Sequence, residues 1–119
     1  MFREVLQGKI HHATVTEADV SYVGSISIDR DLIDLAGFWL GQKVLVVSNT
    51  TGARLETYVI EAPRGSGVIG MNGAAAHVIK KGEQIIIIGF TISETPISPQ
   101  VILVDPQNRF VRELLETRE

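Results

Sequence analysis

Short runs of β-branched or alternating residues, separated by turn residues, recur along this chain and predict a mainly β protein. Residues 25–28 alternate polar and apolar side chains, as a half-buried strand does. The unbroken isoleucine run at residues 85–88 predicts a strand buried on both faces. The expected strands cover residues 2–16, 25–28, 43–48, 53–61, 84–92, 101–104 and a last segment from residue 110, with a solvated tail over 112–119.

Two short helices are expected between the strands. Asp29 is a good N-cap, an apolar stripe follows it, and Gly37 fits the C-terminal cap. Asn72 or Gly73 would cap a second short helix. The aromatic pair Phe38–Trp39 is expected to pack against one end of the barrel. Many short strands with two helical turns favour a compact β-barrel.

Length and composition predict one globular domain over residues 1–119. The net charge of −3 gives no basic footprint for nucleic acid. The chain has no cysteine, which excludes disulfides and thiolate metal sites. No apolar run approaches the ~20 residues of a membrane span, so we expect no membrane partner and a cytoplasmic location.

The histidines do not suggest a metal site. His11 and His12 are adjacent, so in a strand they would point to opposite faces and could not chelate one ion together. His77 is the only other histidine, and no acidic cluster accompanies it. We expect no metal cofactor. Gly8 predicts a bulge or bend in the strand that contains His11 and His12.

The Gly24–Ser25 peptide bond is the main candidate for chemistry. Where the backbone bends, a serine hydroxyl can turn back onto the preceding carbonyl, and glycine leaves room for that approach. An N→O acyl shift followed by elimination and hydrolysis would leave a pyruvoyl group at a new N-terminus. By itself the dipeptide is an ordinary turn signal, and a second copy stands at Gly65–Ser66.

Five motifs, one of which contains this bond, follow one another in a specific order. They are Lys9-Ile10-His11, the segment 18–25 (Ala-Asp-Val-Ser-Tyr-Val-Gly-Ser), the segment 52–58 (Gly-Ala-Arg-Leu-Glu-Thr-Tyr), the segment 61–67 (Glu-Ala-Pro-Arg-Gly-Ser-Gly) and the segment 72–77 (Asn-Gly-Ala-Ala-Ala-His). In this order and spacing the chain resembles the pyruvoyl-dependent aspartate 1-decarboxylase family, from about Phe2 to Thr91.

The resemblance implies a double-psi β-barrel assembled as a homotetramer with active sites at subunit interfaces. It implies a proenzyme that cuts itself into residues 1–24 and 25–119, and a pyruvoyl group made from Ser25 in place of pyridoxal phosphate. Such a ketone forms a Schiff base with the substrate amine and accepts the electrons released with carbon dioxide. The implied reaction converts L-aspartate to β-alanine for pantothenate and coenzyme A synthesis.

The resemblance also implies roles for individual residues. Lys9 and Arg54 would bind the substrate carboxylates, and Tyr58 would donate the proton. Thr57 and Asn72 would assist self-cleavage, and His11 and Tyr22 would flank the cleavage site. The residues implied to contact the substrate are Thr57, Gly73, Ala74, Ala75 and Ala76.

Three positions depart from the usual family pattern, and none removes a reacting group. They are His12 where arginine is usual, Ser21 where histidine is common, and Thr51 where asparagine is common. Two other functions stay open: a decarboxylase that prefers glutamate, since one methylene is worth only about 1–3 kcal/mol of discrimination, and a non-catalytic β-barrel binding module. Whether cleavage needs a maturation factor is open too.

Overall fold

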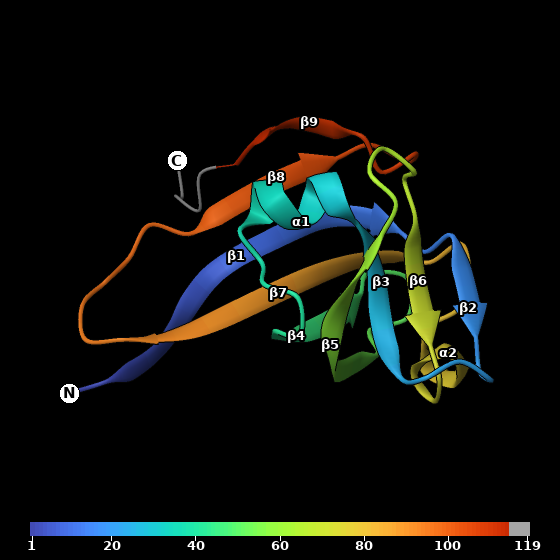
Figure 1. Ribbon diagram of the computed structural model, residues 1–119, viewed down its shortest axis with the longest axis horizontal. Coiled ribbons are helices and arrows are strands. Elements are labelled where there is room, and N and C mark those ends of the chain that lie inside the picture. Colours follow the sequence, from blue (N-terminus) through green and yellow to red (C-terminus); the bar gives the residue numbers. More distant parts are fainter. Residues whose placement is uncertain (115–119) are drawn as a thin grey trace.

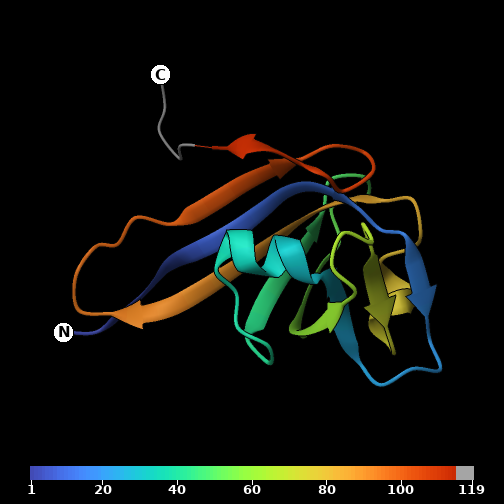
Figure 2. The same ribbon diagram turned by 45° about the horizontal axis from the view of Figure 1, so that its top comes forward.

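The computed structural model describes residues 1–114 and has the expected mainly β architecture (Figures 1 and 2). Its strands are β1 (Arg3–Thr14), β2 (Glu17–Asp19), β3 (Ser25–Asp29), β4 (Lys43–Ser48), β5 (Arg54–Ala62), β6 (Ile69–Asn72), β7 (Gln84–Ser93), β8 (Gln100–Val104) and β9 (Phe110–Glu113). The helices are α1 (Arg30–Ala36) and α2 (Ala75–Val78). The double-psi arrangement of the strands stays a prediction.

The strands form one mixed sheet in the order β2-β6-β3-β5-β4-β7-β1-β8-β9. The long pair β1 and β7 runs the length of the molecule, while β2, β3, β6 and α2 gather at the end away from the N-terminus (Figure 1). Just after β1 the Thr16 N–H donates to the Ile69 carbonyl at 2.8 Å. This bond joins the chain to β6 near the other end of the strand order and helps to close the barrel. The consecutive strands β4 and β5 pair antiparallel, as do β8 and β9, so each pair forms a hairpin.

The core consists mainly of the inward-facing residues of these strands, and isoleucine dominates it. Its fully buried members include Ile10, Ile26, Ile28, Ile33, Ile69, Ile85, Ile87 and Ile102. Helix α1 packs on β1 and β8 and has the expected caps. The Asp29 carboxylate accepts the Asp31 N–H at 2.9 Å, and Gly37 has a left-handed backbone (φ 71°).

Two irregularities bend β1. The register shifts between Leu6 and Gly8, as the glycine predicts, and again between Ile10 and Ala13. At the second shift His12 has a positive φ of 67°, and its ring stacks on His11 with 3.9 Å between centroids. The expectation that these rings point to opposite faces is therefore wrong, because strict alternation does not hold through a bulge.

Three further expectations are corrected. In β7, Ile85 and Ile87 are fully buried, but the intervening Ile86 is only half-buried, so within one chain the strand has one buried face. Phe38 is buried as expected, whereas Trp39 is 80% exposed, so the expected packing against the barrel end is wrong for this residue. Residues 112–113 belong to β9 and not to a tail, and the Leu114 N–H donates to the Val101 carbonyl at 2.8 Å. Residues 115–119 of the expected tail lie outside the described residues.

We expect replacement of Asn108 by alanine to lower the free energy of unfolding by about 2–4 kcal/mol. Asn108 is 1% exposed, and its side chain accepts the Thr14 N–H at 2.8 Å and donates to the Thr14 and Gly67 carbonyls at 2.9 and 2.7 Å. Its φ of 61° also disfavours alanine. Urea unfolding measures the loss. Asn49→Ala, which removes one exposed contact with Gln84, is the control, and equal losses in the two variants would contradict the prediction.

Candidate active site

Ser25 is the first residue of β3 and lies opposite Asn72, the last residue of β6. The Asn72 side-chain amide donates to the hydroxyl of Ser25 at 3.0 Å and to that of Ser27 at 2.9 Å. Ser25 is 1% exposed and Asn72 5%. The expectation that Asn72 or Gly73 caps the second helix is wrong: Asn72 ends a strand, and α2 has Ala74 at its N-cap without a side-chain cap. The amide of Asn72 is turned toward Ser25 instead.

The chain bends sharply just before Ser25. The Ser25 hydroxyl donates to the carbonyl of Val23 at 3.0 Å, which brings it back over the preceding loop. This contact lies one residue further back than the expected approach to the Gly24 carbonyl. Ser25 Oγ is therefore held between a backbone carbonyl and the Asn72 amide, at a bend that contains the candidate bond.

Gly73 lies in close contact with the backbone of this bend. Its φ is +71°, and a Cβ at this position would lie 2.7 Å from the Gly24 Cα and 3.2 Å from the Tyr22 carbonyl oxygen. The Gly73 N–H donates to the Asp19 carbonyl at 2.8 Å. Only glycine allows the backbone of the 20–24 loop to lie this close. The structure thus brings Gly24, Ser25, Asn72 and Gly73 together, with the Tyr22 backbone beside them.

Thr57 and Tyr58 lie on β5, the other neighbour of β3. The two strands are parallel, with Ile26 beside Val59. Continued backwards, this register places Tyr58 level with Ser25 and Thr57 level with Gly24. Because side chains alternate, Tyr58 lies on the outer face and Thr57 on the inner one, in agreement with their exposure. Arg54 and Glu56 share the exposed face with Tyr58, and Leu55 and Val59 share the inner face with Thr57.

The two expected carboxylate ligands lie further away along the sheet. Lys9 is on β1, which the strand order separates from β3 by β7, β4 and β5. Four interstrand spacings amount to ~19 Å. Arg54 opens β5 four residues before Tyr58, a distance of ~13 Å along the strand. The strand order of one chain does not by itself gather both cations at Ser25.

The remaining expected residues are His11 and the three alanines that follow Gly73. His11 is in the second bulge of β1. Gly73 and the three alanines after it form a tight turn in which the Ala76 N–H donates to the Gly73 carbonyl at 3.0 Å. Ala74 is exposed, Ala75 is half-buried and Ala76 is buried, so the side chain of Ala76 packs in the interior.

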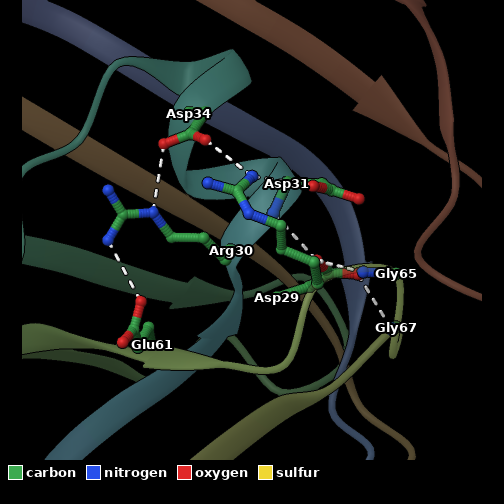
Figure 3. Close-up of polar contacts among 8 residues, drawn as sticks. Asp29, Arg30, Asp31, Asp34, Glu61, Gly65 and Gly67 are labelled. Carbon is green, nitrogen blue, oxygen red and sulfur yellow. Dashed lines mark hydrogen bonds and ion pairs between the residues drawn. The ribbon is translucent and has the colours of Figure 1, made fainter.

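The second glycine–serine pair has a different environment. The Asp29 carboxylate accepts the backbone N–H groups of Gly65 and Gly67 at 3.0 and 2.9 Å (Figure 3). Arg64, the residue before this glycine–serine pair, forms ion pairs with Asp31 and Asp34. Ser66 is exposed and accepts the Val68 N–H at 3.2 Å. Gly65–Ser66 is therefore a turn held in place by a helix cap.

A groove of about 490 Å³ opens beside Asn72. Three of its lining residues are the acidic Glu17, Asp19 and Glu61. A substrate with two carboxylates would be repelled from this side.

In the described part of the chain, no three histidine, cysteine or acidic residues form a group that could hold a metal ion. Residues 1–114 also contain no helix long and apolar enough to cross a membrane.

Two further residues near Ser25, Ser27 and Asp19, are not among the predicted site residues. Ser27 shares the Asn72 amide with Ser25, and the i, i+2 spacing on a strand was a signal for this common face. Asp19 holds Gly73 through its carbonyl and Ser21 through its carboxylate. The Asp-x-Ser spacing is a turn signal.

Comparison with known proteins defines the class of this molecule: it is a small, mainly β decarboxylase. Residues 1–111 match the family model described as aspartate decarboxylase. Proteins named aspartate 1-decarboxylase are similar to it in Neisseria meningitidis (50% identity; 97% of this chain, 93% of the relative), Bacillus velezensis (48%; 92% and 89%) and Carboxydothermus hydrogenoformans (48%; 94% and 91%). The chain belongs to the aspartate decarboxylase family.

Proposed function

We propose that this protein decarboxylates L-aspartate to β-alanine and carbon dioxide after it cuts its own chain between Gly24 and Ser25. One observation carries the proposal: the buried Ser25 hydroxyl lies at a backbone bend, 3.0 Å from the Val23 carbonyl and 3.0 Å from the Asn72 amide. The names of the similar proteins support aspartate as the substrate. The product would enter pantothenate and coenzyme A synthesis in the cytoplasm.

The cleavage begins with attack of Ser25 Oγ on the carbonyl carbon of Gly24. The C–N bond between the two residues breaks, an ester forms, and the hydroxyl proton passes to the new amine. Loss of the Ser25 Cα proton then expels the Gly24 carboxylate and leaves dehydroalanine. Addition of one water releases one ammonia and leaves a pyruvoyl group on residues 25–119. Residues 1–24 end in an ordinary carboxylate.

The surrounding residues supply the polar groups for this sequence. The Asn72 amide already donates to Ser25 Oγ and stabilises the oxyanion that develops beside it. Thr57, which is level with Gly24 when the β3–β5 register is continued backwards, would assist the cleavage from the neighbouring strand. Ser25 fits the implied prosthetic group, because its side chain is buried beside the Asn72 amide and Ser25 is level with Tyr58 when the β3–β5 register is continued.

In the decarboxylation, the pyruvoyl ketone supplies the electron sink when it is present. Arg54 and Lys9 bind the two substrate carboxylates, and Tyr58 delivers the proton to the carbon that loses carbon dioxide. Backbone groups from Gly73 to Ala76 contact the substrate. A homotetramer with active sites at subunit interfaces would let different protomers supply these groups, which agrees with the separation of Lys9 and Arg54 from Ser25 along the sheet of one chain.

The intact mass of the purified protein under denaturing conditions tests this proposal first. We expect a fragment that ends at Gly24 and a second one that is lighter by one ammonia than a chain starting with serine. β-Alanine formation from aspartate should then exceed product formation from glutamate at equal concentration. Faster turnover of glutamate would contradict the proposal that aspartate is the substrate. A protein that keeps its full-length mass after prolonged warming would contradict the proposed self-cleavage.

A further inference from the structure

The loop of residues 20–24, which ends at the candidate bond, is tied down at its first residue. Asp19 ends β2, and its carboxylate oxygen Oδ1 accepts both the backbone N–H of Ser21 at 3.0 Å and the Ser21 hydroxyl at 2.7 Å. The Asp19 carbonyl accepts the Gly73 N–H at 2.8 Å and the Tyr22 N–H at 3.4 Å. Four contacts from one residue thus fix the direction in which the loop starts.

Asp19 and Ser25 flank the same residue of β6. Asp19 is beside Asn72 in the parallel β2–β6 pair, and Ser25 is beside Asn72 in the antiparallel β6–β3 pair. The 20–24 loop therefore spans β6 and passes over Gly73, which it touches at the Tyr22 carbonyl and at Gly24. Because both ends of so short a loop are fixed, a change at its start alters the bend at its end.

We propose that Asp19 is a positioning residue for chain cleavage: its carboxylate, through Ser21, and its carbonyl, through Gly73, hold the loop in the bend that presents the Gly24–Ser25 bond to Asn72. This inference rests on the proposed self-cleavage. Asp19 touches no reacting atom. It acts on the precursor, before the loop is cut, so the decarboxylation by chains that are already cut should not depend on its carboxylate.

The Asp19 carboxylate is oriented by its hydrogen bonds with Ser21. The two contacts from Ser21 lower the pKa of Asp19, so the group is ionised at neutral pH. The titratable groups that line the same groove are Glu17, Tyr22 and Glu61. None of these is cationic, so the hydrogen bonds from Ser21, and not an ion pair within the groove, orient the carboxylate.

The test measures the first-order rate of cleavage of freshly prepared precursor by denaturing gel, and the turnover per cut chain afterwards. We expect Asp19→Ala to slow cleavage about 10- to 100-fold, since small displacements of reacting groups cost rates of that size. Asp19→Asn keeps an Oδ1 acceptor and should restore cleavage to within about threefold of the parent. Ser21→Ala keeps the backbone contact and should slow cleavage by about tenfold or less. Cut chains of every variant should turn over aspartate at the parent rate.

Glu17→Ala is the matched control, because Glu17 lies on the same strand, lines the same groove and carries the same charge. It should be cut at the parent rate. Cleavage of Asp19→Ala at the parent rate, or an equal loss of cleavage and of turnover per cut chain, would overturn the positioning role. Failure of the parent chain itself to cut would instead overturn the proposed function, so the two failures are distinguishable.

Discussion

The Ser25→Ala variant is expected to remain a single uncut chain with no decarboxylase activity. Alanine has no hydroxyl to attack the Gly24 carbonyl, so neither the ester nor the pyruvoyl group can form. The fold should be retained, because within residues 1–114 the Ser25 side chain makes two hydrogen bonds, to Val23 and from Asn72. Intact mass and β-alanine formation are the measurements, with circular dichroism to establish folding.

Ser66→Ala is the matched control for this variant. It removes the hydroxyl of the other glycine–serine pair, whose loop is held by the Asp29 carboxylate through backbone N–H groups. This variant should be cut at residue 24 and should be as active as the parent. A folded Ser25→Ala protein that is still cut, or a Ser66→Ala protein that is not, would show that the wrong bond was chosen.

Replacing Asn72 by alanine is expected to slow cleavage by about 10²–10³-fold, the usual cost of removing one oxyanion donor. The Asn72 amide is the side-chain donor at Ser25 Oγ, and Asn72 is 5% exposed, so water does not replace it readily. The measurement is the cleavage rate of the folded precursor at constant temperature. The free energy of unfolding, measured in parallel, separates a slow variant from an unfolded one.

Ser27→Ala is the control for Asn72. It deletes the other hydroxyl that the same amide contacts, at 2.9 Å, and leaves the contact to Ser25 in place. We expect its cleavage rate to stay within about threefold of the parent, since a single neutral hydrogen bond is worth about 1 kcal/mol. If Asn72→Ala were cut as fast as Ser27→Ala, the oxyanion role of Asn72 would be excluded.

Most of the fold could be predicted because its signals are local. The cap at Asp29 and the glycine at position 37 bound α1, and the turn residues bound the β4–β5 and β8–β9 hairpins. The failures occur where tertiary structure overrides alternation. The bulge at His12 turns two neighbouring rings to the same side, and no propensity shows it.

The site was only partly predictable for the same reason. The sequence predicts Asn72 as a helix cap, because asparagine before glycine and three alanines is a normal helix start. Its pairing with Ser25 depends on β6 lying beside β3, a long-range arrangement that single-sequence patterns do not encode. The separation of Lys9 from Ser25 depends on the strand order in the same way.

The pairing of β1 has a consequence for the mature molecule. A cut after Gly24 leaves β1 and β2 on a peptide that is too short to have a core of its own. That peptide would be retained without a covalent link, because β1 is hydrogen-bonded to both β7 and β8 and β2 to β6. Folding of the precursor closes these ladders within one chain, whereas reassembly from the two pieces is bimolecular. Maturation would therefore be irreversible in practice, because fragments that separate would not reassemble readily. The lifetime of the cut protein would be set by its rate of unfolding.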